Sequence, residues 1–438
     1  MNRTLTYSKN FFNKIDELWR NQTLLAYLIA GTLVTLPLKH IVGSLACIAF
    51  LLVVFFKAKK ANFVISNFLL LPIFLYVLML LSLIWTIETK FTIKGLQKEV
   101  LFLLIPLAFL GLSKINRSTI EKVFQTYSFA MVGYAVFYLV KAVFKFLQSG
   151  KKEVFFYHEL VTLEVNAIYI AVFASLAIFF FLSKKNKSFF DFTGLFILSI
   201  LILLLSSKNI ILVDIALVII YFFFFSNLSK KIKTGIILAI SFLAIIIFLL
   251  VKPIRERFMI EFETVLVDSS LNKTNNQNEE SVFNISLRQA WNQDQFQHND
   301  FFPGTAFRVY QIRIFKEMIQ EENIFFTGFG LDAAQNKIRE KAKQHNLHKS
   351  YGELNFHNEY IQIFSELGIF GFLIVISMLF ITIKKGILNK DFVHIAFAVT
   401  MIVLFLTESF LSRQRGIIFF IIIYCMLNTS NNCNEQKI

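Results

Sequence analysis

The stretch FVISNFLLLPIFLYVLMLLSLIWT, residues 63–86, decides the class of fold because it contains no Asp, Glu, Lys or Arg. An α-helix needs about 20 predominantly apolar residues to cross the hydrocarbon core of a bilayer. The strands of a membrane β-barrel alternate in polarity and are not continuously apolar. The stretch therefore predicts a membrane-spanning helix and excludes a barrel.

Similar apolar stretches recur along the whole chain of 438 residues, in which 56% of the residues are hydrophobic and only 17% are charged. Soluble domains carry about 25% charged residues, so an ordinary soluble enzyme is excluded. We expect an all-α, polytopic integral membrane protein with about 12 transmembrane helices. The predicted segments are residues 23–38, 41–56, 63–86, 100–112, 123–147, 160–183, 190–207, 209–226, 232–251, 357–383, 391–407 and 416–427.

The net charge of +15 comes from 44 Lys and Arg residues against 29 Asp and Glu residues, and its distribution predicts the orientation. If the N-terminus is cytoplasmic, every cytoplasmic loop between segments carries three Lys or Arg residues. Cytoplasmic loops of membrane proteins show this basic bias, so both termini are predicted inside. The excess charge therefore indicates membrane topology, and no nucleic-acid partner is expected.

This orientation places one large loop, residues 252–356, outside the membrane. The loop separates a nine-helix N-terminal membrane region, residues 1–251, from a three-helix C-terminal region, residues 357–438. Within the loop, residues 268–280 are rich in Asn and are predicted as a linker. Helices are predicted over residues 305–322 and 331–343.

Two arginines in the first predicted loop helix have different surroundings on a helical projection. Arg308 falls within the apolar arc, near the helix N-terminus, whereas Arg313 falls on the polar arc. A cation on a packed face needs a partner or a ligand, so Arg308 is a candidate for function or for a structural ion pair. Arg313 is expected to be a solvated surface charge whose replacement is mild.

The end of the loop, where the next membrane helix begins, contains His357 at the expected water–lipid boundary. A histidine there can be neutral near pH 7 and accept a proton from a substrate hydroxyl. The alternative is an interfacial histidine that only makes a local hydrogen bond.

The same helix carries a polar stripe of Glu359, Gln362 and Glu366. Glu366 lies deeper in the predicted membrane, where a carboxylate is costly and indicates either a functional role or a buried partner. Arg413 and Arg415 are the basic residues considered as that partner.

The run HNEYIQIFSELGIFGFL, residues 357–373, resembles the His-Asn-containing, Glu-x-Gly-x-x-Gly signature of the O-antigen ligase family and related O-antigen polymerases. Supporting matches occur in the family's order. Ser206-Ser207-Lys208 opens a helix where the family usually has Ser-Arg, and Arg308 begins a helix that leads to Gly328-Phe329-Gly330.

The resemblance implies a GT-C-like membrane glycosyltransferase of lipopolysaccharide biosynthesis, multi-pass in the bacterial inner (cytoplasmic) membrane, with its active site facing the periplasm. Its donor would be a glycan linked to undecaprenyl pyrophosphate, and its acceptor, for ligases, a sugar hydroxyl of lipid A-core. The donor carries its own leaving group, so no cofactor and no metal are expected. The chain also lacks a Walker A sequence and an Asp-x-Asp pair.

The resemblance also implies roles for individual residues in an inverting, single-displacement transfer. Catalytic roles fall to His357, which would orient or deprotonate the acceptor hydroxyl, and to Arg308, which would bind the pyrophosphate. Lys208 would assist, although it lacks the bidentate geometry of the usual Arg, and Arg288 is a spare cation for the same task. Asn358, Glu366, Gly328 and Gly330 are expected to support the site.

Two alternatives remain at this stage. A polysaccharide polymerase would use the same lipid-linked donor, although polymerases often have two sizeable periplasmic loops and only one is predicted here. A polytopic transporter or flippase would usually show two related halves, which the sequence lacks.

Overall fold

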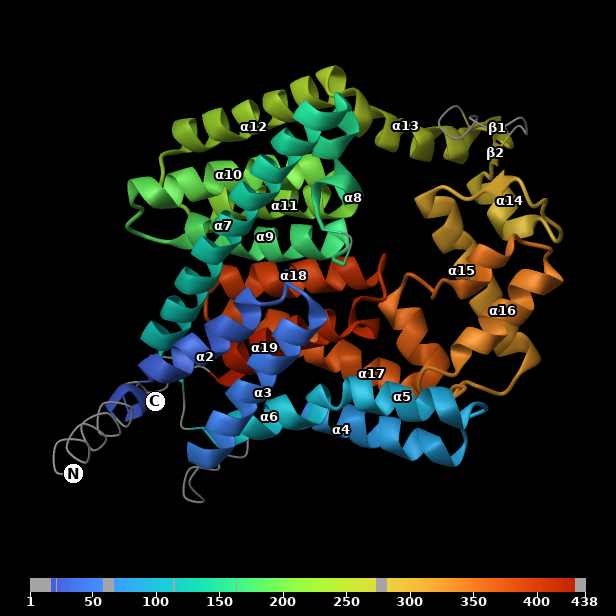
Figure 1. The fold of residues 1–438 in the computed structure, drawn as a ribbon, viewed down its shortest axis with the longest axis horizontal. Helices are drawn as coiled ribbons and strands as arrows, with labels where there is room; N and C mark the ends of the chain where they lie inside the picture. The colour runs from blue at the N-terminus through green and yellow to red at the C-terminus, as the bar shows by residue number, and fades with distance from the viewer. Residues whose placement is uncertain are drawn as a thin grey trace.

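The computed structural model describes residues 17–20, 22–57, 67–112, 115–162, 164–272 and 282–429. The chain is mostly helical, which confirms the predicted helical class. A bundle of roughly parallel and antiparallel helices makes up most of the molecule, and residues of the predicted outer loop form a smaller body at one end of it (Figure 1).

Each of the twelve predicted apolar segments overlaps one helix of the bundle. Among the described residues, five helical stretches are long and apolar enough to cross a membrane, namely residues 40–57, 67–84, 117–149, 208–225 and 359–388. The count of twelve spans and the external position of the loop stay predictions. The bundle helices are α2 (Thr23–Val34), α3 (His40–Lys57), α4 (Asn67–Leu81), α6 (Leu101–Leu110), α7 (Arg117–Ser149), α9 (Ala167–Ser183), α10 (Phe189–Leu205), α11 (Lys208–Ile220), α12 (Lys230–Leu250), α17 (Glu359–Leu388), α18 (Phe392–Phe405) and α19 (Gln414–Thr429).

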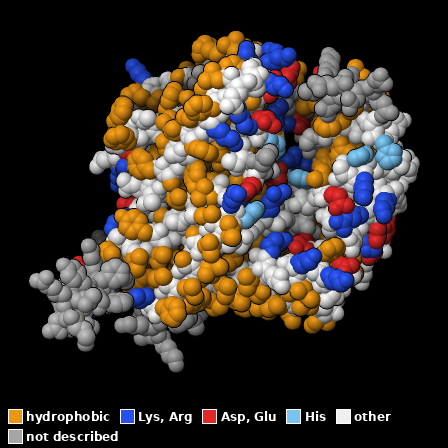
Figure 2. All heavy atoms as spheres, in the orientation of Figure 1, with side chains coloured by type: hydrophobic (Ala, Val, Ile, Leu, Met, Phe, Trp, Pro, Cys, Tyr) orange, Lys and Arg blue, Asp and Glu red, His pale blue; other side chains and the backbone are white. Residues whose placement is uncertain are grey.

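The centre of the bundle is formed by helices that are apolar on every side. In α19 every residue from Arg415 to Asn428 is buried, and α9 is buried along nearly its whole length. A helix that is hydrophobic all round is stable only inside a large core or in lipid. Hydrophobic side chains also cover much of the outer face of the bundle (Figure 2), as a protein surface in contact with lipid requires.

Two α-helices of this region, the four-residue α8 (Tyr157–Leu160) and the longer α5 (Thr89–Glu99), were not predicted. Helix α5 carries several lysines and continues into α6 through Val100, which keeps helical backbone angles. The short segment at residues 100–112 is therefore the inner half of a longer helical rod. The turn before α5 holds the loop body, because Ile87 donates its backbone N–H to Phe329 and Trp85 donates its indole N–H to Thr327.

The loop body combines helices with a small sheet. The predicted helices are confirmed as α15 (Gly304–Glu321) and α16 (Ala334–Gln344), whereas α13 (Lys252–Leu266) and α14 (Leu287–Asn292) were not predicted. The unpredicted strands β1 (Ser270–Leu271), β2 (Phe283–Asn284) and β3 (Asp300–Phe301) form a sheet in the order β1-β2-β3, antiparallel then parallel. Most of the predicted Asn-rich linker lies outside the described residues. A separate aromatic core that includes Phe302, Tyr310 and Phe356 packs beneath α15.

The expectation that Arg313 is a solvated charge is wrong. Its side chain is only 10% exposed and pairs with Asp294 at 2.7 Å and with Glu317 at 2.8 Å. It also donates to the carbonyl oxygen of Gln293 at 2.6 Å. The segment after α14 folds back over this face of α15 and covers it, which a projection of one helix cannot show.

The loop body is joined to the bundle by two short backbone segments that pack directly on each other. Phe329 and Gly330 donate their N–H groups to Ser365 and Glu366 of α17, at 2.8 Å and 2.9 Å. Gly328 has φ of +66°, and a Cβ there would lie 2.4 Å from the carbonyl carbon of Glu366. Only glycine allows both the left-handed backbone and this approach. Gly328 and Gly330 therefore act here as docking positions of the backbone.

The partner segment is a break in α17. Gly368 has φ of +65° and ψ of −163°, so the helix is interrupted at this residue. A Cβ on Gly368 would lie 2.3 Å from the carbonyl carbon of Phe326. Gly368, the first glycine of the Glu-x-Gly-x-x-Gly run, thus has a structural explanation, and the break sets the angle at which the first turns of α17 approach the loop body.

Candidate active site

Three of the predicted site residues lie in one polar cluster between the bundle and the loop body. Lys208 begins α11, Arg308 is in the first turns of α15 and His357 precedes α17. Two carboxylates, Glu261 of α13 and Glu408 of the segment after α18, complete the cluster. Charged and histidine side chains gather around a hollow on the face between these two parts of the molecule (Figure 2).

Arg308 is fixed by backbone carbonyl groups. Its Nε donates to the carbonyl oxygen of Thr407 at 2.8 Å, and its Nη1 donates to that of Gly304 at 3.0 Å. Its Nη2 lies 3.5 Å from Oε1 of Glu408, which is the longest of the three contacts. The sequence left open whether Arg308 is functional or forms a structural ion pair. The structure allows both, because the ion pair is long and the guanidinium is held in place without it.

His357 shares the same carboxylate. Its Nδ1 lies 3.3 Å from Oε2 of Glu408, so one glutamate bridges the imidazole and the guanidinium of Arg308. In the tautomer that donates from Nδ1 to this carboxylate, Nε2 is a proton acceptor. Within the described residues, Nε2 makes no hydrogen bond. The ring of Phe307 packs edge-on against the imidazole, with 5.7 Å between ring centroids.

Lys208 belongs to the second ion pair of the cluster. Its ammonium group contacts Oε1 of Glu261 and donates to the carbonyl oxygen of Arg257 at 3.2 Å. The other oxygen of Glu261 accepts the N–H of Thr305 at 3.0 Å, at the start of the helix that carries Arg308. Burial alone would raise the pKa of Glu261, but Lys208 and these hydrogen bonds lower it, so this carboxylate remains charged.

Unusual backbone angles occur at the cluster. His357 has φ of +46°, and Ser206, just before Lys208, has φ of +51°. Left-handed angles are uncommon for residues other than glycine and cost roughly 1–3 kcal/mol when the surrounding structure enforces them. Strain of this kind is concentrated at functional sites, so the backbone supports the assignment made from the side chains.

The other predicted residues lie around the cluster. Asn358 accepts the N–H of Ile361 at the start of α17 and donates to the carbonyl oxygen of Leu406, and so ties α17 to the segment that carries Glu408. Arg288 is exposed on α14, and within the described part of the chain its side chain makes no ion pair. Its role as a spare cation stays a prediction.

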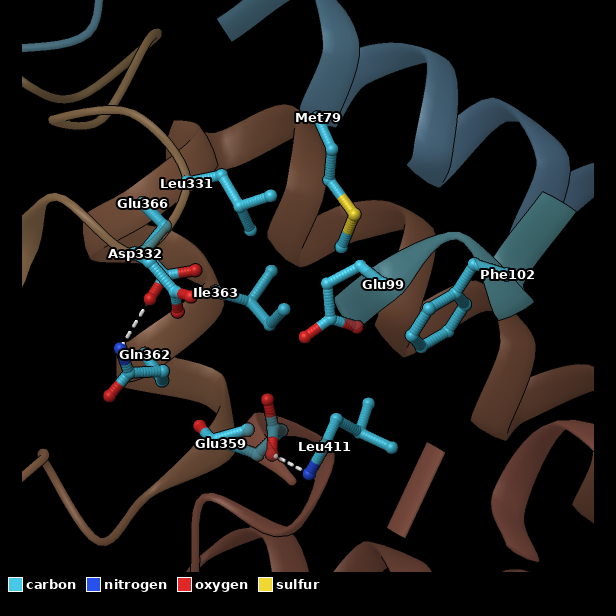
Figure 3. A pocket seen from close by; sticks show the side chains of 11 residues that line it. Met79, Glu99, Phe102, Leu331, Asp332, Glu359, Gln362, Ile363, Glu366 and Leu411 are labelled. Carbon is cyan, nitrogen blue, oxygen red and sulfur yellow. Dashed lines mark hydrogen bonds between the residues drawn. The ribbon is translucent and has the colours of Figure 1, made fainter. Parts of the chain in front are cut away.

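Glu366 lies in a different, buried cluster. Its carboxylate accepts from Gln362, and it lines a small cavity with Glu99, Glu359 and Asp332 (Figure 3). Asp332 is paired with Lys98 at 2.9 Å. This cluster joins α5, α17 and the loop body, so Glu366 supports the architecture of the site.

The predicted alternative partners of Glu366 are wrong. Arg415 donates to the carbonyl oxygens of Glu164 and Leu38, and within the described residues Arg413 forms no ion pair with Glu366. The error arises because the side of α17 that carries Glu366 faces α5 and the loop body.

Sequence reasoning missed the two carboxylates and Arg257. Glu408 is an isolated acidic residue between two apolar segments, which is the signal that could have identified it. Glu261 lies in the stretch KPIRERFMIEFE, residues 252–263, whose mixed charges gave no specific signal before α13 was known.

The fold and the cluster define a helical membrane protein with a cationic, histidine-containing site at the junction of its bundle and a loop body. A protein family model described as O-antigen ligase matches residues 193–376, which confirms the resemblance noted in the sequence. The matched region makes up 184 of the 438 residues of the chain. A search of curated proteins finds no match.

The matched region includes Lys208, Glu261, Arg308 and His357. The matched region ends before Glu408, so only the structure identifies this residue as the bridge between Arg308 and His357.

Proposed function

We propose that this protein is an O-antigen ligase-type transferase that moves a glycan from undecaprenyl pyrophosphate to an acceptor sugar hydroxyl such as one of lipid A-core. The reaction would be inverting, would need no metal, and would take place on the periplasmic side of the inner membrane. The observation that carries the proposal is the bridge made by Glu408, which brings a guanidinium and an imidazole together on one carboxylate.

The cations suit the leaving group. Negative charge grows on the pyrophosphate as the bond to the sugar breaks, and preorganised donors stabilise that charge. Arg308 is preorganised by the carbonyl groups of Thr407 and Gly304, while its weakly held Nη2 is available to a phosphate oxygen. Lys208 adds a second positive charge beside it, and Glu261 holds Lys208 in position before the donor binds.

The imidazole suits the acceptor. The acceptor oxygen attacks the anomeric carbon from the face opposite the pyrophosphate, and the bond from that carbon to the pyrophosphate oxygen breaks. The hydroxyl proton passes to Nε2 of His357, and the leaving group departs with the bonding electron pair. Glu408 stabilises the imidazolium that forms, as the acidic partner of a catalytic histidine does. General base catalysis of this kind contributes typically about 10²–10⁴-fold.

The test is a transfer assay with the full-length protein in liposomes, a lipid-linked glycan and lipid A-core, without nucleotide. Arg308→Ala and His357→Ala are each expected to slow transfer by about 10²-fold or more, while the protein remains inserted and folded. Arg339→Ala is the matched control, because Arg339 pairs with the half-exposed Glu353 on the loop body.

Product size distinguishes the two lipid-linked reactions. A ligase moves one block to a new acceptor, whereas a polymerase lengthens the glycan on the carrier. Wild-type levels of transfer in both variants, or a requirement for ATP, would contradict the proposal.

A further inference from the structure

A third cation, Arg257, lies beside the cluster without a role in the reaction described above. It is on α13, and its backbone carbonyl oxygen accepts the hydrogen bond from Lys208. Its guanidinium carbon lies 3.6 Å from the centroid of the Tyr157 ring, so the guanidinium is stacked on the tyrosine. Such stacking positions a guanidinium while leaving its N–H groups available at the edge.

Arg257 also differs from the other two cations in its charge balance. Lys208 is paired with Glu261, and Arg308 contacts Glu408, whereas Arg257 has no carboxylate partner within the described residues. The three cations and two carboxylates thus leave an excess of positive charge at one place. Like charges gathered without compensation are unfavourable unless an anion binds between them.

The surroundings of Arg257 place it toward the cluster. Burial and, next, the charge of Arg257 lower the pKa of His158, and the charge of Glu408 acts on the same histidine in the opposite direction. His158 follows Tyr157, on whose ring Arg257 is stacked, so the charges of Arg257 and Glu408 both act on this part of the chain. Tyr157 has φ of +50°, which is a third left-handed residue at this place.

We propose that Arg257, held against Tyr157, binds the diphosphate of the lipid-linked donor as the third cation of the site. The inference rests on the proposed function and assigns to it a residue outside the predicted set. Lys208 offers a point charge, whereas a guanidinium offers two parallel N–H groups that match a pair of phosphate oxygens. The ligand class is a polyprenyl diphosphate, with or without its glycan.

The experiment compares five variants in the liposome transfer assay and in inhibition by undecaprenyl diphosphate, the product lipid. Arg257→Ala is expected to lower kcat/KM by about 10²-fold, the loss typical of one charge-stabilising donor. It should also weaken inhibition by the product lipid, whereas Arg257→Lys should lie between Arg257→Ala and the wild type. Tyr157→Leu removes the stacking surface without changing the charge. Like Arg257→Ala, it should weaken inhibition by the product lipid.

The matched control is Arg255→Ala on the same helix, because the Arg255 side chain donates to the carbonyl oxygen of Leu249 and, within the described residues, makes no ion pair. Equal kinetics of Arg257→Ala and Arg255→Ala, with Arg308→Ala slowed, would overturn the role of Arg257 and leave the proposed function intact. A wild-type protein that neither transfers glycan nor is inhibited by the product lipid would overturn both. Melting temperatures of all variants separate loss of binding from loss of folding, and Tyr157→Leu tests the site if Arg257→Ala does not fold.

Discussion

The replacement Glu408→Gln tests the bridge between His357 and Arg308, because it keeps the shape of the side chain and removes its charge. The Nδ1–Oε2 distance of 3.3 Å is longer than the 2.7–2.9 Å of the strongest charge-assisted bonds. Hydrogen bonds to charged groups contribute about 1.5–3 kcal/mol, and this long bond belongs to the lower part of that range. Since each factor of ten corresponds to about 1.4 kcal/mol, kcat should fall roughly 10–30-fold.

The assay is initial-rate transfer with varied donor concentration, using Glu408→Gln, His357→Ala and the double variant. The two residues act as one unit, so the double variant should be no slower than His357→Ala. The KM for the donor should not rise in Glu408→Gln. The reason is that the Glu408 carboxylate competes with the donor phosphate for Arg308, and the variant removes its charge. Glu164→Gln is the control, as Glu164 is a half-exposed carboxylate paired with Lys39.

Two results would refute this reasoning. One is a Glu408→Gln variant with unchanged kcat. The other is a double variant whose loss equals the product of the two single losses, since independent residues give additive free energies.

Three further predictions concern the stability of the loop body and its junction, measured as thermal unfolding of the purified protein in detergent. Arg313→Ala should destabilise by about 2–3 kcal/mol because it breaks hydrogen bonds between charged, largely buried groups, and a change as small as that of Arg339→Ala would contradict this. Gly368→Ala should destabilise the protein by about 2–5 kcal/mol, because it places alanine in the left-handed region and its Cβ would clash with the backbone of Phe326. Gly133→Ala is the control and should be neutral, because a Cβ there would have no neighbour within 4 Å. Burial is the largest cause that lowers the pKa of His345, which faces Glu317, Arg313, Lys341 and Asp294. The unfolded state therefore binds more protons than the folded state, and stability should fall as the pH drops below about 6.5. A His345→Gln variant whose stability has the same pH dependence would argue against this cause.

The sequence predicted the parts of the fold that depend on local patterns. Apolar runs identify the bundle helices, because a helix in lipid must be apolar over its whole length. The periodicity of residues 305–322 likewise predicted α15. Helix α5 was missed because its lysines interrupt the apolar pattern.

The parts that depend on contacts between distant segments could not be predicted. Glu408 lies 100 residues from Arg308 in the chain, and their contact requires the end of α18 to meet the start of α15. The burial of Arg313 depends on a segment about 20 residues away that folds over its helix. The candidate cations and His357 were identified from the family resemblance, but the carboxylates that arrange them required the structure.

The most direct test is to identify, by mass spectrometry, the lipid product that the wild-type protein releases in liposomes when the transfer reaction contains no nucleotide. We expect one undecaprenyl diphosphate released for each glycan moved to the acceptor, with inverted anomeric configuration, and release at least about 10²-fold slower by His357→Ala. Transfer that retains the anomeric configuration, or that leaves the diphosphate on the glycan, would contradict the proposed reaction.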